Sequence, residues 1–297
     1  MTALQKDLER AITQALTEID DPGPIQPMRS VGGGCINNAS QVVTPKGSYF
    51  LKWNAAPLPN MFTAEAKGLQ LLAATNTIRL PVVIKVQEAE PDLPAFILME
   101  WIERRSGFDQ RLCGQQLAQL HLNGTSDDYG LDNDNYIGST PQYNGWQSDW
   151  VEFFREKRLQ PQIELAIRNG RCDATRRKKL EKLLSRLDEW LGGVNRMPSL
   201  LHGDLWGGNV IGDEKTNPVL IDPAVYYGDR EADLAFTQMF GGFSQPFYHA
   251  YNETYPLEAD YQKRFELYNI YHTLNHLNLF GESYGYSLDG TLRRFVG

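Results

Sequence analysis

Hydrophobic residues near the start of the chain follow first a helical and then a strand-like spacing. The helical spacing is set by Leu4, Leu8, Ile12, Leu16 and Ile19. The run Asp21-Pro22-Gly23-Pro24 ends this pattern. Two short β-type runs follow at residues 40–44 and 48–54, and Pro45-Lys46-Gly47 between them is typical of a tight turn. The pattern predicts a helix followed by a β-hairpin.

The rest of the first hundred residues continues this mixed pattern. A helical period returns from residue 61 to about 75, and strand-like runs follow at 80–88 and 94–103. A glycine-rich segment, VGGGCINN at 31–38, stands directly before the hairpin. We therefore expect a small unit that is rich in β-structure and carries one internal helix.

Beyond about residue 101 helical periodicity dominates. It is found at residues 108–122, 147–169, 174–191, 231–240 and 258–280. The polar connection at 123–145 is too long for a simple link. Two short apolar runs, NVIGD and PVLIDP, predict a hairpin with Asn209 and Asp222 at its two ends. The chain is thus expected to be an α+β protein with a small lobe at 1–101 and a mainly helical lobe at 102–297.

Composition narrows the classes of partner. The net charge of -8 argues against nucleic acid or an anionic membrane, because neither attracts an acidic surface. No segment approaches the roughly 20 apolar residues of a membrane helix, and the first residues do not resemble a secretory signal. Cys35, Cys113 and Cys172 form no CxxC pair, so neither a disulfide framework nor a zinc site is indicated. We expect a cytoplasmic protein without nucleic-acid or membrane partners.

The segment LLHGDLWGGNV at 200–210 carries the candidate chemistry. Asp204 is followed five positions later by Asn209, then by the predicted hairpin and Asp222, an order that kinase-type phosphoryl-transfer enzymes use. In such sites the first aspartate accepts or orients the proton of the attacking hydroxyl, and an ordinary pKa is sufficient. The asparagine and the second aspartate supply the oxygen ligands that Mg²⁺ prefers. Alone, however, an HGD sequence is most often a structural turn with a packed histidine.

The order of other residues favours the kinase interpretation. Gly32, Gly33 and Gly34 precede Lys52 on a predicted strand, and Glu65 follows on the next predicted helix. In kinases a glycine loop approaches the phosphates, a lysine contacts them and a glutamate fixes that lysine. Singly, these residues would be a flexible turn, a solvated charge and an exposed helix residue, and the GxGxxG spacing is missing. The combined order predicts a kinase-type fold.

The chain resembles the fructosamine kinase (ketosamine-3-kinase) family, a branch of the aminoglycoside-phosphotransferase-like kinases with a protein-kinase-like fold. The matching segments are LLHGDLWGGNV, LIDPAVYYGDREADLAFTQMFGGF, NGWQSDWVEFFREKRLQ, MFTAEAKGLQLL and NHLNLFGESY, which together span nearly the whole chain. HGDxxxxN is shared by many small-molecule kinases. The tryptophan after HGD, DPA in place of DFG, and WQxDW narrow the choice.

The resemblance implies roles for individual residues. Asp204 is expected to be the catalytic base, and Asn209 and Asp222 the Mg²⁺ ligands. Lys52 would contact the phosphates of ATP, with Glu65 as its partner. Adenine is expected to meet the backbone of a hinge that consists of Met99, Glu100, Trp101 and Ile102.

Three further residues have implied places around the catalytic loop. Trp206 would cover the sugar-like part of the substrate, although a core aromatic is an equal alternative. His202 is placed on the substrate side, where it orients the loop rather than transferring protons. Asp233 is expected to hold the backbone of the loop.

The implied reaction is ATP- and Mg²⁺-dependent phosphorylation of the 3-hydroxyl of ketosamines, either small molecules or glycated proteins. The product decomposes and frees the amine, which gives a role in deglycation. Two alternatives remain: a kinase for another small hydroxylated amine, such as an aminoglycoside or choline, and a nucleotide-binding pseudokinase. The intact set of Lys52, Asp204, Asn209 and Asp222 argues against the pseudokinase. The preferred sugar is open.

Cys35 directly follows the three glycines, where loop amides that favour phosphate also favour a thiolate. We expect oxidants to inhibit through this thiol, by linking two chains. The alternative is a small loop residue selected for its size. The expected state is a monomer or a weak, redox-linked dimer.

Overall fold

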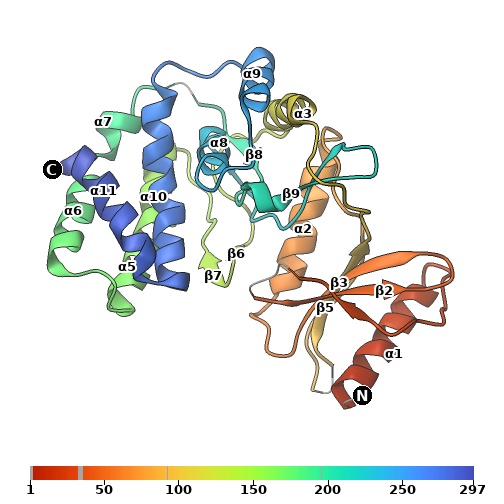
Figure 1. Cartoon of the computed structure of the whole chain (residues 1–297). Helices are drawn as coiled ribbons and strands as arrows, with labels where there is room; N and C mark the ends of the chain where they lie inside the picture. The colour runs from red at the N-terminus through yellow and green to blue at the C-terminus, as the bar shows by residue number, and fades with distance from the viewer. Residues whose placement is uncertain (1–2, 33–35, 92, 195) are drawn as a thin grey trace.

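The computed structural model describes residues 3–32, 36–91, 93–194 and 196–297. These residues form two lobes that lie side by side (Figure 1). The small lobe contains the elements from α1 to β5, and the helical lobe contains those from α3 onward. The predicted α+β, two-lobed architecture is confirmed. The exact division at residue 101 stays a prediction.

The small lobe is built on a five-stranded antiparallel sheet with the strand order β1-β2-β3-β5-β4. Its strands are β1 (Arg29–Ser30), β2 (Asn38–Val43), β3 (Ser48–Asn54), β4 (Val83–Gln87) and β5 (Ala95–Glu100). The helices are α1 (Ala3–Thr17) and α2 (Met61–Ala74). The hairpin, both helices and the two later strands therefore form where the hydrophobic pattern predicts them.

Strand β5 is covered on both faces, which explains its uninterrupted apolar sequence. Phe96 and Leu98 point to the face where α1 packs. Ile97 and Met99, which alternate with them, belong to the main core together with α2. One helix thus covers each face of the sheet.

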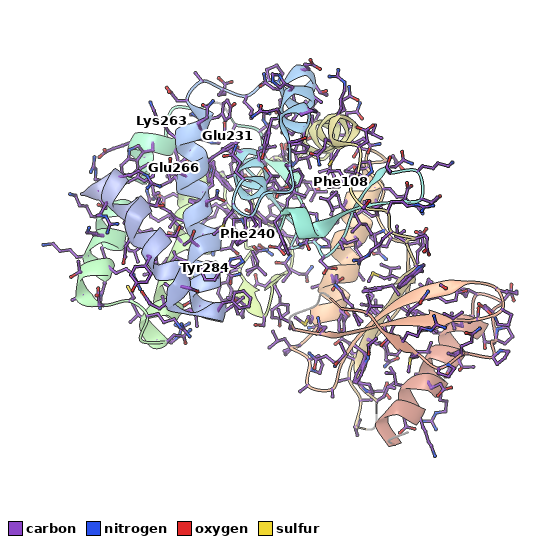
Figure 2. The ribbon with its side chains drawn as sticks, in the orientation of Figure 1. Phe108, Glu231, Phe240, Lys263, Glu266 and Tyr284 are labelled. Atoms are coloured by element: carbon purple, nitrogen blue, oxygen red, sulfur yellow. The ribbon has the colours of Figure 1, made fainter. Side chains whose placement is uncertain are left out.

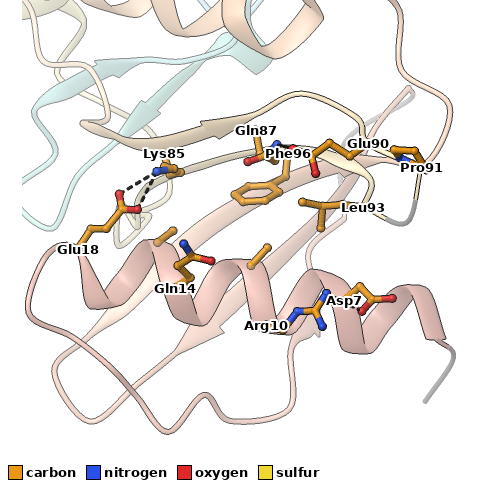
Figure 3. A pocket seen from close by; sticks show the side chains of 12 residues that line it. Asp7, Arg10, Gln14, Glu18, Lys85, Gln87, Glu90, Pro91, Leu93 and Phe96 are labelled. Atoms are coloured by element: carbon orange, nitrogen blue, oxygen red, sulfur yellow. Dashed lines mark hydrogen bonds and ion pairs between the residues drawn. The ribbon is translucent and has the colours of Figure 1, made fainter.

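Helix α1 also borders a polar groove of about 500 Å³ on the outer side of the small lobe (Figure 3). Two ion pairs lie on its rim. Lys85 Nζ lies 2.8 Å from a Glu18 oxygen, and Arg10 lies 3.1 Å from Asp7. The first pair joins the end of α1 to the edge strand β4, and the second lies within α1, away from the cleft between the lobes.

In the described part of the helical lobe there are one long helix, several shorter ones and three small β-ladders. Its helices are α3 (Gln110–Asn123), α4 (Trp150–Phe153), a π-helix (Phe154–Leu159), α5 (Gln160–Arg168), α6 (Ala174–Leu184), α7 (Leu187–Leu191), α8 (Glu231–Thr237), α9 (Gln245–Thr254), α10 (Tyr261–Phe280) and α11 (Gly285–Val296). Its strands are β6 (Asn135–Ile137), β7 (Thr140–Gln142), β8 (Ser199–Leu201), β9 (Val210–Gly212), β10 (Pro218–Leu220) and β11 (Tyr226–Gly228). Antiparallel pairs join β6 to β7, β8 to β11 and β9 to β10.

The hydrophobic pattern located most of these helices but not all of them. The helix expected at 147–169 is divided by the π-helix, and the one at 174–191 breaks after Leu184. Helices α9 and α11 and the ladder of β6 with β7 lie where no element was expected. In the described ranges, no helix has both the length and the apolar composition needed to cross a membrane.

Candidate active site

A cleft of about 730 Å³ lies between the two lobes and collects most of the candidate residues. Lys52 and Glu65 line it from the small lobe. Asp204, Asn209 and Asp222 line it from the helical lobe. Residues that are more than 150 positions apart in sequence therefore meet in one site.

The candidate catalytic loop, residues 202–209, follows β8, which pairs with β11. Gly203 has a φ of 78°, and a Cβ atom there would lie 2.0 Å from the carbonyl oxygen of Ala224, so a larger residue cannot adopt this backbone. The backbone N–H groups of His202 and Gly203 donate to the carboxylate of Asp233 at 2.7 and 2.9 Å. Asp233 is only 2% exposed and sits in α8, so the loop is fastened to the helical core.

His202 is completely buried behind this loop. Its Nε2 lies 2.9 Å from the carbonyl oxygen of Ile221, and burial lowers the pKa of the ring. His202 is therefore not part of the cleft lining, although it was placed on the substrate side. The ring ties the catalytic loop to the segment that leads to Asp222, which agrees with the orienting role expected for it.

Asp204 is held in place by Asn209. The amide nitrogen of Asn209 donates to Asp204 Oδ2 at 2.9 Å and to the Asp204 carbonyl at 2.8 Å. Burial raises the pKa of Asp204 to about 7, with a further contribution from Asp222, while the hydrogen bond from Asn209 opposes the rise. This differs from the ordinary pKa expected from the sequence, because the carboxylate lies deep in the cleft. A group with such a pKa is suited to accept a proton near neutral pH.

Lys52 connects the two lobes. Its ammonium lies 2.7 Å from Glu65 on α2 and 2.6 Å from Asp222 in the helical lobe. Burial opposes the charged form of Lys52, but Asp222 and Glu65 outweigh it and raise its pKa. Glu65 is the partner expected from the sequence, whereas the ion pair with Asp222 is a further finding.

The two oxygen donors expected for Mg²⁺ are both at the cleft. The nitrogen of the Asn209 side chain is used by Asp204, which leaves its carbonyl oxygen for another partner. Asp222 has a side chain that is 44% exposed. Within the described residues no group of three or more His, Cys, Asp or Glu could hold a metal alone. Two oxygen donors fit an ion that takes its remaining ligands from phosphates and water.

The hinge residues Met99, Glu100, Trp101 and Ile102 all line the cleft. The side chain of Glu100 accepts a 2.6 Å hydrogen bond from Arg79, which also donates to Asp213 at 2.8 Å. Asp213 lies in the turn of the β9–β10 hairpin, so Arg79 ties the hinge to the element that carries Asn209 and Asp222. No pattern in the sequence predicted this second bridge between the lobes.

Of the glycine-rich loop, Gly32 also lines the cleft. Gly33, Gly34 and Cys35 lie outside the described residues. The expected role of Cys35 in oxidation therefore stays a prediction. Of the other two cysteines, both of which are free thiols, Cys113 is buried and Cys172 partly buried.

Trp206 lies on the cleft and is 37% exposed, which favours a surface position over the core alternative. Its indole packs edge to face with the ring of Phe240, and the two ring centroids lie 5.9 Å apart. Phe240, His276, Phe280 and Tyr284 extend this wall of the cleft from the end of α8 to the end of α10. Figure 2 shows Phe240 and Tyr284 on this part of the helical lobe. Sequence reasoning missed them as lining residues, because exposed aromatic residues on separate segments leave no local pattern.

A model for one protein family matches nearly the whole chain. It is described as fructosamine kinase and covers residues 8–296. The chain belongs to the fructosamine kinase family. The resemblance noted in the sequence is thereby confirmed.

Curated relatives agree with this assignment. A protein-ribulosamine 3-kinase of Arabidopsis thaliana is 46% identical over 86% of this chain and 78% of its own length. A probable ketoamine kinase of Synechocystis is 44% identical over 89% and 88% of the two chains. This kinase is therefore an ATP-dependent phosphotransferase of the ketosamine class, as the family resemblance implied.

Solved structures confirm the fold. A provisionally named fructosamine-3-kinase from Haemophilus somnus superposes with a TM-score of 0.90 at 30% identity, over 100% of both chains. An aminoglycoside phosphotransferase superposes with a TM-score of 0.65 at 14% identity, over 99% of this chain and 100% of its own, and it supports the fold alone.

Proposed function

We propose that this kinase transfers the γ-phosphoryl group of Mg·ATP to the 3-hydroxyl of a ketosamine, with Asp204 as the residue that accepts the hydroxyl proton. The observation that carries the proposal is that Lys52, Asp204, Asn209 and Asp222 all line one cleft. Their order and chemistry are those of phosphoryl-transfer enzymes. The acceptor class follows from the family.

Asp204 has the properties that the proton-accepting role needs. Its carboxylate faces the cleft, and Asn209 fixes its orientation through a 2.9 Å hydrogen bond. A raised pKa of about 7 places the carboxylate close to the working pH. As the sugar hydroxyl attacks phosphorus, its proton passes to Asp204, while the phosphoryl bond to the leaving ADP oxygen breaks.

The phosphate side of the site combines Asn209, Asp222 and Lys52. Asn209 and Asp222 would hold Mg²⁺, which supplies neutralisation of the phosphate charge. Lys52 would exchange its ion pair with Asp222 for contacts to the α- and β-phosphates, while Glu65 keeps it in place. A buried ammonium held between two carboxylates is charged and oriented before nucleotide arrives, so little is lost in ordering it.

The remaining candidate residues surround these groups. Gly32, together with Gly33 and Gly34, would cover the phosphates, and the hinge from Met99 to Ile102 would receive adenine. Trp206 would cover the sugar of the ketosamine from the helical lobe. His202 acts from behind the loop through Ile221. The phosphorylated product decomposes and releases the amine, which gives the kinase a role in deglycation.

The experiment that tests this proposal is a panel of acceptors assayed for ADP formation with and without Mg²⁺. The panel contains fructosamine, ribulosamine and erythrulosamine derivatives, a glycated protein, an aminoglycoside and choline. We expect Mg²⁺-dependent turnover of the ketosamines and release of free amine. Turnover of choline or the aminoglycoside alone would overturn the acceptor class, and nucleotide binding without any turnover would favour the pseudokinase.

A further inference from the structure

The long polar connection at 123–145 contains a hairpin formed by β6 and β7, called here the insert hairpin (residues 135–142). It belongs to the helical lobe in sequence but reaches the small lobe. Gly138 at its turn has a φ of 62°, and a Cβ atom there would lie 3.3 Å from Ile36 of the glycine-rich segment and 3.2 Å from Leu279 of α10. The tip therefore lies between the two walls of the cleft.

The insert hairpin binds the backbone that follows Asp222. Asn135 donates to the carbonyl of Val225 at 2.8 Å, and Gln142 donates to the carbonyl of Ala224 at 3.0 Å. Both side chains are buried, so these bonds are shielded from water. Asp222 itself has a φ of 56°, a conformation that a non-glycine residue keeps only when its surroundings hold it. The hairpin supplies part of that support.

The buried guanidinium of Arg158 determines the direction in which the side-chain amides of Asn144 and Asn135 point. Arg158 is completely buried, with its guanidinium 3.8 Å from the ring centre of Tyr226. Among the described residues no carboxylate forms an ion pair with Arg158; one of its nitrogens instead donates to Asn144 Oδ1 at 2.7 Å. Because a guanidinium can only donate, Asn144 must turn its nitrogen to Asn135 Oδ1, at 2.9 Å. Asn135 is thereby left with its nitrogen facing Val225.

The other side of the insert hairpin reaches helix α2, which lies against β6. The hydroxyl of Tyr136 donates to the carbonyl of Pro59 at 2.8 Å, two residues before α2 begins. Helix α2 also packs on the backbone after Asp222. At Gly68, three residues beyond Glu65, a Cβ atom would lie 3.1 Å from the side chain of Val225. The insert hairpin, helix α2 and the segment after Asp222 thus each contact the other two.

We propose that the insert hairpin is a strut that fixes α2 relative to the segment of Asp222, with Tyr136 and Arg158 as positioning residues. By fixing α2, the strut sets the position of Glu65 relative to Asp222, so that Lys52 can pair with both carboxylates. The proposal rests on the proposed function only in so far as Lys52 and Asp222 serve the nucleotide. It gives a role to an insert to which the sequence alone assigned none.

The first test replaces Tyr136 by Phe, which removes one hydroxyl and keeps the ring. We expect the affinity for a non-hydrolysable Mg·ATP analogue to fall roughly 2- to 10-fold, the effect of losing one hydrogen bond. The matched control is Tyr143→Phe, because Tyr143 directly follows the hairpin and the residue is 45% exposed. An equal loss in the control, or none in Tyr136→Phe, would overturn the strut.

The second test distinguishes positioning from direct contact, since Tyr136 also lines the cleft. If the hydroxyl acts through α2 and Glu65, adding Tyr136→Phe to Glu65→Gln should lower the affinity less than about 2-fold further. The same fold-loss in both backgrounds would mean that Tyr136 touches the nucleotide itself, and the proposal would fail.

The third test uses Arg158→Lys, which keeps the charge and loses the planar fork. A weaker affinity for the ATP analogue with an unchanged melting temperature supports the strut, and a lower melting temperature with unchanged affinity contradicts it. Analogue binding needs no acceptor. Failure of ketosamine turnover in the unmodified protein would therefore count against the proposed function and leave this inference standing.

Discussion

The two halves of the active site are held in different ways. The catalytic loop of the helical lobe is fastened from inside its own lobe, where Asp233 accepts hydrogen bonds from two consecutive backbone N–H groups. Lys52 of the small lobe is instead held by one carboxylate from each lobe. The group proposed to accept the proton is therefore held within one lobe, whereas the ammonium proposed to bind phosphate is held only when the lobes are correctly placed.

The two kinds of contact also differ in how readily one partner can be exchanged for another. Hydrogen bonds from backbone N–H groups to a buried carboxylate are charge-assisted and difficult to replace. An ion pair that bridges a cleft can exchange one partner for a phosphate oxygen, because the ammonium stays neutralised. We therefore expect the helical-lobe side of the site, with Asp204, Asn209 and Asp222, to be the rigid half. The small-lobe side, with Lys52 and Glu65, is expected to be the half that responds to nucleotide. Three substitutions test this division.

The largest effect is expected from Asp204→Asn, which keeps the shape of the side chain and removes the proton acceptor. Turnover of the ketosamine should fall by on the order of 10²- to 10⁴-fold. Nucleotide binding should survive, because Lys52, Asn209 and Asp222, which are proposed to hold Mg·ATP, are unchanged. The measurement is the rise in melting temperature on addition of Mg·ATP. The contrasting variant is Asp222→Asn, which should lose this rise together with activity. Near-normal phosphorylation by Asp204→Asn would show that the loop is structural.

An intermediate effect is expected from Lys52→Ala. Loss of one charged hydrogen-bonding group corresponds to roughly 10- to 100-fold in kcat/KM for ATP. Glu65→Ala should act in the same direction but more weakly, since it disturbs only the position of the ammonium. The measurement is initial rate against ATP concentration at saturating acceptor. If neither variant changes kcat/KM for ATP, Lys52 does not contact the nucleotide.

The smallest effect is expected from Gly68→Ala at the contact of α2 with Val225. The added methyl group crowds a side chain 3.1 Å away and should shift Glu65, which lowers kcat/KM for ATP roughly 2- to 5-fold. Alanine also favours the helix by about 1 kcal/mol, so the melting temperature should change little. The control is Gly290→Ala in α11, where the nearest atom to a Cβ is 3.9 Å away. It should raise the melting temperature and leave the kinetics alone, whereas equal kinetics in both variants would contradict the role of the α2 contact.

The rigid half of the site was readable from the sequence because its parts are close together in the chain. Asp204 and Asn209 are five residues apart, and the apolar runs that form β9 and β10 place Asp222 at the far end of a short hairpin. This short spacing is enough to predict that these side chains share the cleft. Strand β3 and helix α2 could be located for the same reason, since their patterns are strong and local.

The responsive half was readable only in part. The order of Lys52 and Glu65 predicted their pairing, but nothing in the pattern indicated that Asp222 would share the ammonium across 170 positions. The pattern also missed the insert hairpin, whose strands have only three residues each. Buried polar contacts such as that of Arg158 with Asn144 depend on tertiary packing, and a charged residue in a sequence is by default expected at the surface.

The π-helix Phe154–Leu159 makes the position of Arg158 depend on the number of residues in this turn. This turn is wider than an α-helical turn, because its hydrogen bonds span five residues rather than four. Deleting one residue from it would allow α4 and α5 to join as a continuous helix, and the narrower turn would change the direction in which its own residues point. Arg158 would then turn away from the ring of Tyr226, although no residue that contacts it had changed. The position of Arg158 therefore depends on the number of residues in this segment as well as on their identities.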